Sequence, residues 1–517
     1  EGHAYLDLKE PPNDLPSFSK HWPSVSAWEA ALAASPVARL ESETASTPLA
    51  LCAGSALYLE KFYQYEKRLA TFLRERSKVK GALEPAAHDV VERAVDRPFF
   101  VITGGPGTGK TTLALHYLNT LIDNWSSPLP PRFATVAPTG KAAARLAESI
   151  ANGIEKLDTT QQRKDQIRRI PCLTIHRLLG PLPHRTSFRR NARNPITYDA
   201  LVIDESSMVD LPLMLRLFEA LPTSCRLLLL GDKDQLASVE VGSVLSDILE
   251  ASAEPGSPLG PCVELLTKTY RFREDSSIFR ACRHARLGET DDFATMIEER
   301  LADFEFHPVA EDAARVPEKA LRAAADHHQR LASCASAELA LKQLSDAIVL
   351  TPNRQGPFGS VEFNRNVERR LRKAADLHPD AEIHARPVIV LENDYELELY
   401  NGDLGIVWID EDAGALACFP SSAGSPRRFR LAELPRHESA FALTIHKSQG
   451  SEFRVANVLI GPRDSSLITR ELLYTAFSRA KERLSLVANA SVLLEGISRK
   501  ARRATRLAEL LGKAPID

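Results

Sequence analysis

The chain has 517 residues, which at roughly 150 residues per domain predicts three or four domains. Lys and Arg total 65 against 68 Asp and Glu, so the formal net charge is −3, and 44% of the residues are apolar. This balance excludes a collagen-like or low-complexity chain and disfavours disorder or a coiled coil throughout. The chain as a whole also lacks the basic excess that is typical of nucleic-acid binders.

Membrane and disulfide signals are both missing from the sequence. No run approaches the ~18 consecutive apolar residues that a transmembrane helix needs, so we expect a cytoplasmic protein without membrane contact. The seven cysteines are scattered without a Cys-x-x-Cys pair, which disfavours a disulfide framework and a zinc ribbon and favours reduced, buried thiols. The first residue is Glu1 rather than Met, from which we expect the chain to start inside a longer one.

Residues 1–84 carry no chemical motif. Residues 57–76 place apolar and aromatic side chains at helical spacing, which predicts an amphipathic helix. We therefore predict a helical N-terminal domain over 1–84 whose apolar, charge-poor parts dock against a partner.

From residue 99 onward, short apolar runs alternate with helical stretches, which predicts parallel α/β sheets. A segment rich in Pro and Gly at 253–261 interrupts the alternation and predicts a boundary between two α/β units, 85–262 and 263–517. The apolar runs are 99–103, 133–137, 201–204, 226–230 and 263–266, then 347–351, 441–445, 455–460 and 484–487.

Charge is distributed unevenly. Residues 163–193 hold nine Lys or Arg and one acid, whereas 391–412 hold eight acids and no Lys or Arg. A second basic run spans 499–506. Such runs are usually solvated helix faces, but the first lies between two nucleotide-site motifs, so we favour a functional role for it.

A phosphate-binding loop is predicted where the first apolar run meets a helical stretch. Gly104 and the triplet Gly109-Lys110-Thr111 have the spacing Gly-x-x-x-x-Gly-Lys-Thr, in which backbone N–H groups surround a phosphate at a helix N-terminus. Lys110 is expected to reach the β- and γ-phosphates and the Thr111 hydroxyl to bind Mg²⁺. The expected nucleotide-binding residues are Gly104, Gly105, Pro106, Gly107, Thr108, Gly109, Lys110, Thr111 and Thr112.

An acidic pair, Asp204-Glu205, closes the apolar run at 201–204. Asp204 is expected to hold Mg²⁺ and Glu205 to orient or deprotonate the attacking water. Two adjacent carboxylates at a strand end are costly unless they face a cation. The loop and the acidic pair together predict a nucleoside triphosphate hydrolase, and they leave open what the hydrolysis drives.

Three further side chains are suited to sensing the terminal phosphate. Gln235 follows the apolar run at 226–230, and Arg271 and Arg479 lie in the second α/β unit. An arginine from a facing domain can stabilise the charge of the transition state and couple hydrolysis to closure of the cleft. On sequence alone, each arginine is equally well a surface residue.

Seven blocks occur in the order of the superfamily 1 DNA helicase motifs. They lie at 137–146, 174–179, 204–205, 231–236, 270–272, 443–453 and 474–483. From Gly2 to its end the chain resembles the RecD family, the alpha subunits of exodeoxyribonuclease V (the RecBCD complex), including non-motif stretches at 356–359 and 401–406.

The resemblance implies an ATP-dependent 5′→3′ DNA helicase with ATP and Mg²⁺ as cofactors. The implied catalytic residues are Lys110, Asp204, Glu205, Gln235 as γ-phosphate sensor, and Arg271 and Arg479 as arginine fingers, with Thr111 and Asp204 at the metal. The implied DNA-binding residues are Pro138, Thr139, Gly140, Lys141, Thr174 and His176 on the first domain and Thr444, His446, Lys447, Ser448 and Gln449 on the second. Hydroxyl, amide and cationic groups of this kind suit sequence-neutral phosphate contacts.

The same resemblance implies an α/β fold of two RecA-like P-loop domains with small inserted domains and the helical N-terminal domain. The first insertion is expected at about 181–198 and helps to split the duplex, and the second, at about 401–434, resembles an SH3-like domain. The implied partners are single-stranded and tailed duplex DNA and RecB-like and RecC-like subunits in a heterotrimer. One departure concerns the base: related helicases often carry a Gln before the loop, where this chain has Ala87-His88.

Two alternatives remain beside the motor subunit. A stand-alone superfamily 1 helicase would carry the same motifs, although the N-terminal region and short insertions favour the subunit. A catalytically silent P-loop scaffold is disfavoured because Lys110, Asp204, Glu205, Gln235 and both arginines are present. A nuclease is disfavoured because no dense group of acids and Lys lies outside the ATP site, so nuclease activity is expected in a partner chain.

Overall fold

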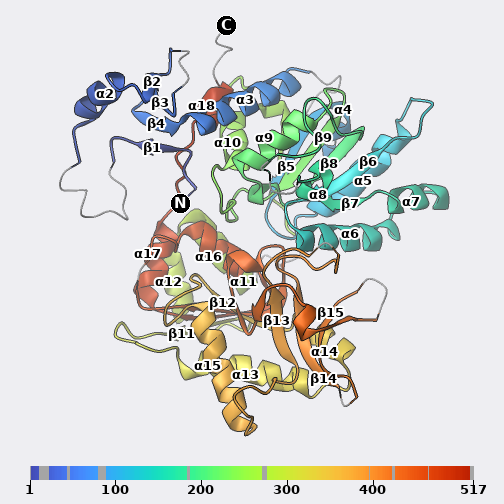
Figure 1. Cartoon of the computed structure of the whole chain (residues 1–517), viewed down its shortest axis with the longest axis vertical. Helices are drawn as coiled ribbons and strands as arrows, with labels where there is room; N and C mark the ends of the chain where they lie inside the picture. The colour runs from blue at the N-terminus through green and yellow to red at the C-terminus, as the bar shows by residue number, and fades with distance from the viewer. Residues whose placement is uncertain are drawn as a thin grey trace.

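The computed structural model describes residues 2–10, 22–43, 47–79, 89–182, 185, 187–270, 276–394, 396–410, 412–421, 425–463 and 465–512. Its described strands form four sheets, two of them parallel and covered by helices (Figure 1). The predicted α/β class is therefore confirmed. All seven cysteines are free and five of them are buried, as the sequence analysis expects.

A parallel six-stranded sheet in the order β10-β5-β9-β8-β6-β7 organises the first lobe. Its central strands are buried on both faces, which explains their continuous apolar sequences. The strands are β5 (Phe99–Gly104), β6 (Phe133–Ala137), β7 (Cys172–Thr174), β8 (Ala200–Ile203), β9 (Arg226–Gly231) and β10 (Val263–Leu266). The helices are α4 (Val90–Asp96), α5 (Lys110–Asp123), α6 (Gly140–Ile154), α7 (Gln161–Arg168), α8 (Ile175–Leu179), η1 (Ser206–Met208), α9 (Leu211–Ala220), α10 (Val244–Ala253) and η2 (Gly260–Cys262).

A second parallel sheet, in the order β11-β20-β19-β12-β18, organises the second lobe. Its core includes Phe293 and Phe477, whose rings stack at 5.8 Å between centroids. The strands are β11 (Phe304–Pro308), β12 (Ala347–Thr351), β18 (Ala442–Thr444), β19 (Phe453–Ile460) and β20 (Ala480–Ala488). The helices are α11 (Ser277–Leu287), α12 (Thr290–Glu298), α13 (Glu318–Ala332), α14 (Ala337–Gln343), α15 (Ser360–Ala374), η4 (His446–Ser448), α16 (Arg470–Phe477) and α17 (Ala490–Ser498).

The predicted division at 262/263 is wrong by one strand. β10 pairs in parallel with β5, with Val263 opposite Val101 and Leu266 opposite Gly104, so residues 263–266 complete the first sheet. The segment rich in Pro and Gly at 253–261 therefore forms the turn before this edge strand and not a domain boundary. The first lobe therefore ends after Leu266.

A small antiparallel domain is inserted in the second lobe. Its sheet has the order β16-β15-β14-β13-β17 and extends from 386 to 439, beyond the predicted 401–434. The outer limits differ because β13 and β17 pair with each other across the insertion. The elements are β13 (Arg386–Val390), β14 (Leu404–Asp410), β15 (Gly414–Phe419), β16 (Arg427–Arg430), η3 (Leu431–Glu433) and β17 (His437–Ser439).

The other predicted insertion, at 181–198, is small. Among its described residues, isolated antiparallel bridges join Pro181 to Phe188 and Asn191 to Asn194.

The N-terminal region is mixed rather than helical, which corrects the prediction. A four-stranded sheet in the order β1-β4-β3-β2 lies beside two helices. Its strands have three or four residues, too few to show a period in the sequence. The elements are β1 (Tyr5–Asp7), α2 (Val25–Ala33), β2 (Ala38–Leu40), β3 (Leu49–Cys52), β4 (Ala56–Leu59) and α3 (Glu60–Ser77), the last being the predicted amphipathic helix.

The C-terminal segment returns to the first lobe, so the second domain does not extend to 517 as predicted. Helix α18 (Leu507–Gly512) packs with α3 in one hydrophobic core with the first lobe, and Figure 1 shows it beside α3. Arg503 and Arg506 of the second basic run are engaged within the protein. Arg503 donates to Glu240 O at 2.6 Å and Gly242 O at 2.7 Å, and Arg506 pairs with Glu509 at 2.7 Å.

The first basic run is also partly neutralised within the protein. Arg163 pairs with Asp123 at 2.7 Å, and Arg168 pairs with Glu155 and Asp165. These pairs leave the preferred functional role of this run as an untested prediction.

Candidate nucleotide and DNA site

The phosphate loop joins β5 to α5. Gly107 and Gly109 have φ values of +75° and +86°, the left-handed conformation that glycine adopts without strain. Lys110 donates to the carbonyl oxygens of Gly104 and Gly105, the latter at 2.9 Å, so its ammonium lies within the loop. The loop can thus present backbone N–H groups and one cation to a phosphate.

The acidic pair follows β8 at the same edge of the sheet. Burial and the neighbouring Glu205 carboxylate raise the pKa of Asp204 to about 6. Glu205 adopts a left-handed φ of +50°, and its N–H donates to Asp204 Oδ1 at 2.8 Å. A strained backbone and a carboxylate with a raised pKa are features of functional sites. The carboxylates of Asp204 and Glu205 and the hydroxyl of the half-buried Thr111 are hard oxygen ligands of the kind that Mg²⁺ prefers. These residues therefore fit the implied metal.

A chain of hydrogen bonds crosses from the first lobe to the second behind the phosphate loop. Gln235 Nε2 and Tyr474 Oη both donate to Asp232 Oδ2, at 2.9 and 3.0 Å. Arg479 Nη2 donates to Gln235 Oε1 at 3.1 Å. The structure thus places Gln235 of the first lobe and Arg479 of the second lobe in direct contact.

Arg479 is buried and held on the side of the second lobe. It also donates to Thr475 O at 3.0 Å and to Ser451 O at 3.1 Å. This leaves its guanidinium little freedom, so it is pre-organised at the boundary between the lobes.

Arg271 lies outside the described residues, as do Ala87 and His88. The segment just before Arg271 contacts the phosphate loop, because Tyr270 N–H donates to Gly107 O at 2.8 Å.

Sequence reasoning missed two polar residues of this cluster, Asp232 and Tyr474. Asp232 is buried and its pKa is raised by desolvation. A methyl group in place of the Gly105 hydrogen would lie 2.9 Å from Tyr474 Oη, so this tyrosine of the second lobe touches the phosphate loop. Both residues lie inside the motif blocks, Asp232 three positions before Gln235 and Tyr474 five positions before Arg479.

Three predicted DNA-binding threonines share one local geometry. Thr139 caps α6 by accepting from Ala142 N at 3.2 Å, and Thr174 caps α8 by accepting from Arg177 N at 3.0 Å. Thr444, on the second lobe, accepts from Lys447 N at 3.4 Å. Thr174 and Thr444 are the last residues of parallel strands, and Thr139 follows β6 by two residues, so the three hydroxyls lie at the carboxyl edges of the two sheets, where α/β folds bind ligands.

The remaining candidates of the first lobe surround the start of α6. Pro138 is half-buried, Gly140 is buried, and the Lys141 ammonium is buried. His176 packs against Phe188 at 5.8 Å between ring centroids, and burial lowers its pKa.

The second-lobe candidates are buried or half-buried. Burial lowers the pKa of His446, and Lys447 donates to Glu438 Oε1 at 2.5 Å. Ser448 is fully buried and donates to Ile445 O at 2.7 Å. Gln449 donates across the lobes to Leu236 O at 3.0 Å. In this conformation the side chains of Ser448 and Gln449 support the fold and the contact between lobes.

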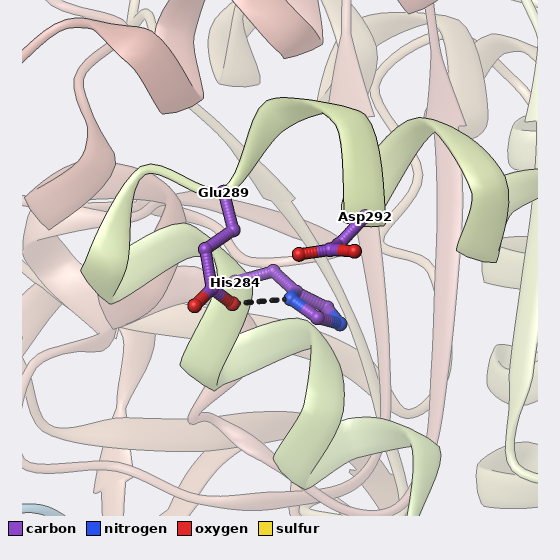
Figure 2. Close-up of side chains that lie close together, drawn as sticks. All are labelled: His284, Glu289 and Asp292. Atoms are coloured by element: carbon purple, nitrogen blue, oxygen red, sulfur yellow. Dashed lines mark hydrogen bonds and ion pairs between the residues drawn. The ribbon is translucent and has the colours of Figure 1, made fainter.

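Within the described chain, one trio of side chains offers three close metal-ligand atoms: His284, Glu289 and Asp292 (Figure 2). His284 Nδ1 lies 2.7 Å from Glu289 Oε2, and Glu289 also pairs with Arg283 at 3.3 Å. Because both His284 and Arg283 already engage the Glu289 carboxylate, the trio braces the turn between α11 and α12.

Separately, no helix in the described residues combines the length and apolar character needed to cross a membrane.

Comparison with known proteins gives consistent matches. The family described as an AAA domain matches residues 87–241, and the UvrD-like helicase C-terminal domain matches residues 439–487. The chain is similar to the RecBCD enzyme subunit RecD of Mycolicibacterium smegmatis, with 35% identity over 100% of this chain and 92% of that protein. The RecD subunit of Haemophilus influenzae is 31% identical over 81% of this chain and 71% of its own length. The ATP-dependent RecD2 DNA helicase of Deinococcus radiodurans is 28% identical over 95% of this chain but only 63% of its own length.

Proposed function

The chain belongs to the RecD family of RecBCD enzyme subunits, and we propose that it is the 5′→3′ DNA motor of such a complex. It is an ATP-dependent DNA helicase subunit whose family acts in DNA repair and recombination.

The hydrogen bond from Arg479 to Gln235 is the observation that carries the proposal. It joins the lobe that holds the phosphate loop to the other lobe at a buried position. Loss of the γ-phosphate next to Gln235 would change the environment of this pair. Such a change can be converted into relative movement of the lobes, which is what a translocase needs.

The chemistry at the nucleotide follows from the residues around the loop. Lys110 would exchange its contacts with Gly104 and Gly105 for the phosphates, and Glu205 would take a proton from the attacking water. Bound Mg²⁺, held by Thr111 and Asp204, would neutralise charge that develops on the phosphate oxygens. Arg479 and Arg271 would stabilise the same charge from the second lobe.

DNA is proposed to lie along the carboxyl edges of both sheets. The hydroxyls of Thr139, Thr174 and Thr444 retain one hydrogen each for a phosphate oxygen while they accept from the backbone. Contacts of this type are independent of base sequence, which suits a motor that must move along any strand.

RecB-like and RecC-like subunits are the proposed protein partners, in a cytoplasmic heterotrimer. The exposed apolar side chains of the N-terminal region support a docking role for it. They are Leu6, Val37, Leu40, Leu59 and Val79.

A stand-alone helicase is the second candidate. The match to the RecD2 DNA helicase of D. radiodurans leaves more than a third of that protein uncovered, whereas the match to the M. smegmatis subunit covers 92% of it. The difference in coverage favours the subunit.

DNA-stimulated ATP hydrolysis tests the proposed site. Lys110→Gln is expected to abolish hydrolysis on single-stranded DNA while thermal unfolding is unchanged, because among the described residues the lysine hydrogen-bonds only to loop carbonyls. Lys156→Gln, at an exposed position on the same lobe, serves as the control. Parental hydrolysis by Lys110→Gln would refute the site.

A further inference from the structure

The loop before β14 lies on the start of α6. Residues 396–403, here called the Tyr400 loop, belong to the small antiparallel domain of the second lobe, whereas α6 belongs to the first lobe. A methyl group in place of the Gly140 hydrogen would lie 2.8 Å from Cδ2 of Tyr400, and closer still to its Cβ and Cγ. The tyrosine side chain therefore covers the helix N-terminus directly.

The same loop lies against Lys141, because a methyl group in place of a Gly402 hydrogen would lie 3.9 Å from Lys141 Cδ. The Lys141 ammonium is buried and has no hydrogen-bond partner among the described residues. Burial lowers the pKa of Lys141 to about 8, although the Asp403 carboxylate acts on it in the opposite sense. A buried cation without a hydrogen-bonded partner is unfavourable, and an anion with free oxygens would relieve that cost.

The N-terminus of α6 favours an anion for a second reason. The helix has 15 residues, and its first-turn N–H groups and dipole attract negative charge. A phosphodiester would find two complementary features here, namely the helix N-terminus and the Lys141 ammonium.

The Tyr400 loop is negatively charged, as a phosphodiester is. Residues 391–412 contain eight acids and no Lys or Arg, and Glu396, Glu398 and Asp403 lie within the loop. Asp403 Oδ2 also accepts from Tyr400 N at 2.9 Å, so the acid fixes the tyrosine backbone. The loop thus presents an aromatic ring and a carboxylate at one place, as a nucleotide presents a base and a phosphate.

The loop has a defined shape. Arg427 donates to Glu398 O at 2.9 Å, and Leu399 forms an antiparallel bridge with Asp394. Glu398 and Gly402 have left-handed φ values of +53° and +97°. Because these contacts fix the backbone of the loop, we expect the loop to move as a unit.

We propose that the Tyr400 loop is an autoinhibitory cover on a phosphodiester site made by the N-terminus of α6 and Lys141. Single-stranded DNA and the loop compete for this site, so the loop must leave before DNA binds there. The identity of the ligand as DNA rests on the proposed function, whereas the covering contact does not.

Equilibrium binding of a fluorescent single-stranded oligothymidylate to the full chain tests the competition. Tyr400→Ala removes the covering ring and is expected to lower the Kd about tenfold. Asp403→Asn removes the competing charge but keeps an acceptor for Tyr400 N–H, and is expected to lower it about threefold. Asp412→Asn makes the same charge change at an exposed position of the same small domain and should leave the Kd unchanged.

Acylation of lysines by a succinimidyl ester, read by mass spectrometry, tests the cover without DNA. Lys141 should react slowly in the parental chain and faster in Tyr400→Ala, whereas the exposed Lys156 should react equally in both. Unchanged Lys141 reactivity would overturn the cover. Unchanged or weaker DNA binding by Tyr400→Ala would overturn the competition, since weaker binding would make Tyr400 a DNA contact. If the parental chain and every variant fail to bind DNA, the proposed function fails, and Lys141 reactivity still decides whether the loop covers it.

Discussion

Replacing Gln235 with alanine removes the hydrogen bond that Arg479 of the second lobe donates to Gln235 of the first lobe. Arg479 Nη2 donates to Gln235 Oε1 at 3.1 Å, and Gln235 Nε2 donates in turn to Asp232 Oδ2 at 2.9 Å. In the variant, Arg479 keeps its bonds to Thr475 O and Ser451 O. The guanidinium therefore stays near its place but loses this hydrogen bond to the nucleotide lobe.

The magnitude follows from one lost bond to a charged group. Such bonds are worth about 1.5–3 kcal/mol, and if the bond stabilises the transition state, that range corresponds to a decrease in kcat of about 10- to 100-fold. Complete loss of an arginine finger costs about a thousandfold or more. We therefore expect Arg479→Ala to be more severe than Gln235→Ala.

Steady-state ATP hydrolysis at saturating single-stranded DNA measures the effect, together with the Kd for ATP. Gln343→Ala, the same change at an exposed position of the second lobe, is the matched control. The double variant Gln235→Ala/Arg479→Ala should be no slower than Arg479→Ala alone, because both single changes break one interaction. A parental kcat for Gln235→Ala, or fully additive losses in the double variant, would refute the coupling.

Three other changes separate chemistry from stability. Glu205→Gln should leave the Kd for ATP unchanged but lower kcat at least about 100-fold, since a general base is lost; a parental kcat would exclude Glu205 as the base. Thr475→Val leaves Leu236 N–H without its 2.9 Å acceptor and should cost about 1–3 kcal/mol in urea unfolding; Thr475→Ser keeps the hydroxyl and should restore most of it. Burial raises the pKa of Glu66 to about 7, so stability present below pH ~4.5 is lost as the pH rises through ~7. Glu66→Gln should abolish that loss of up to about 3 kcal/mol, and an unchanged pH dependence of unfolding would contradict it.

The two parallel sheets and the nucleotide motifs could be predicted because their signals are local. Strands such as Phe99–Gly104 are continuous apolar runs, and the loop chemistry is set by closely spaced glycines and Lys110. The family resemblance implied separate roles for Gln235 and Arg479 at the γ-phosphate, but it did not predict their hydrogen bond. Its residues are 244 positions apart, and no local pattern reports such a contact.

The incorrect predictions concern elements whose partners are distant. β10 belongs to the first sheet because it pairs with β5, and α18 returns to α3 across most of the chain. The N-terminal sheet escaped detection because its strands are very short. Since α3 shares a core with the first lobe, deletion of residues 1–84 should destabilise the motor, in contrast to the separable docking domain that sequence suggested.

Strand displacement on duplexes with either a 5′ or a 3′ single-stranded tail tests the central claim most directly. The parental chain is expected to unwind the 5′-tailed duplex in the presence of ATP and Mg²⁺, and Lys110→Gln is expected to unwind neither substrate. Unwinding restricted to the 3′-tailed duplex would contradict the proposed polarity. ATP-independent displacement, or displacement that survives Lys110→Gln, would contradict the motor itself.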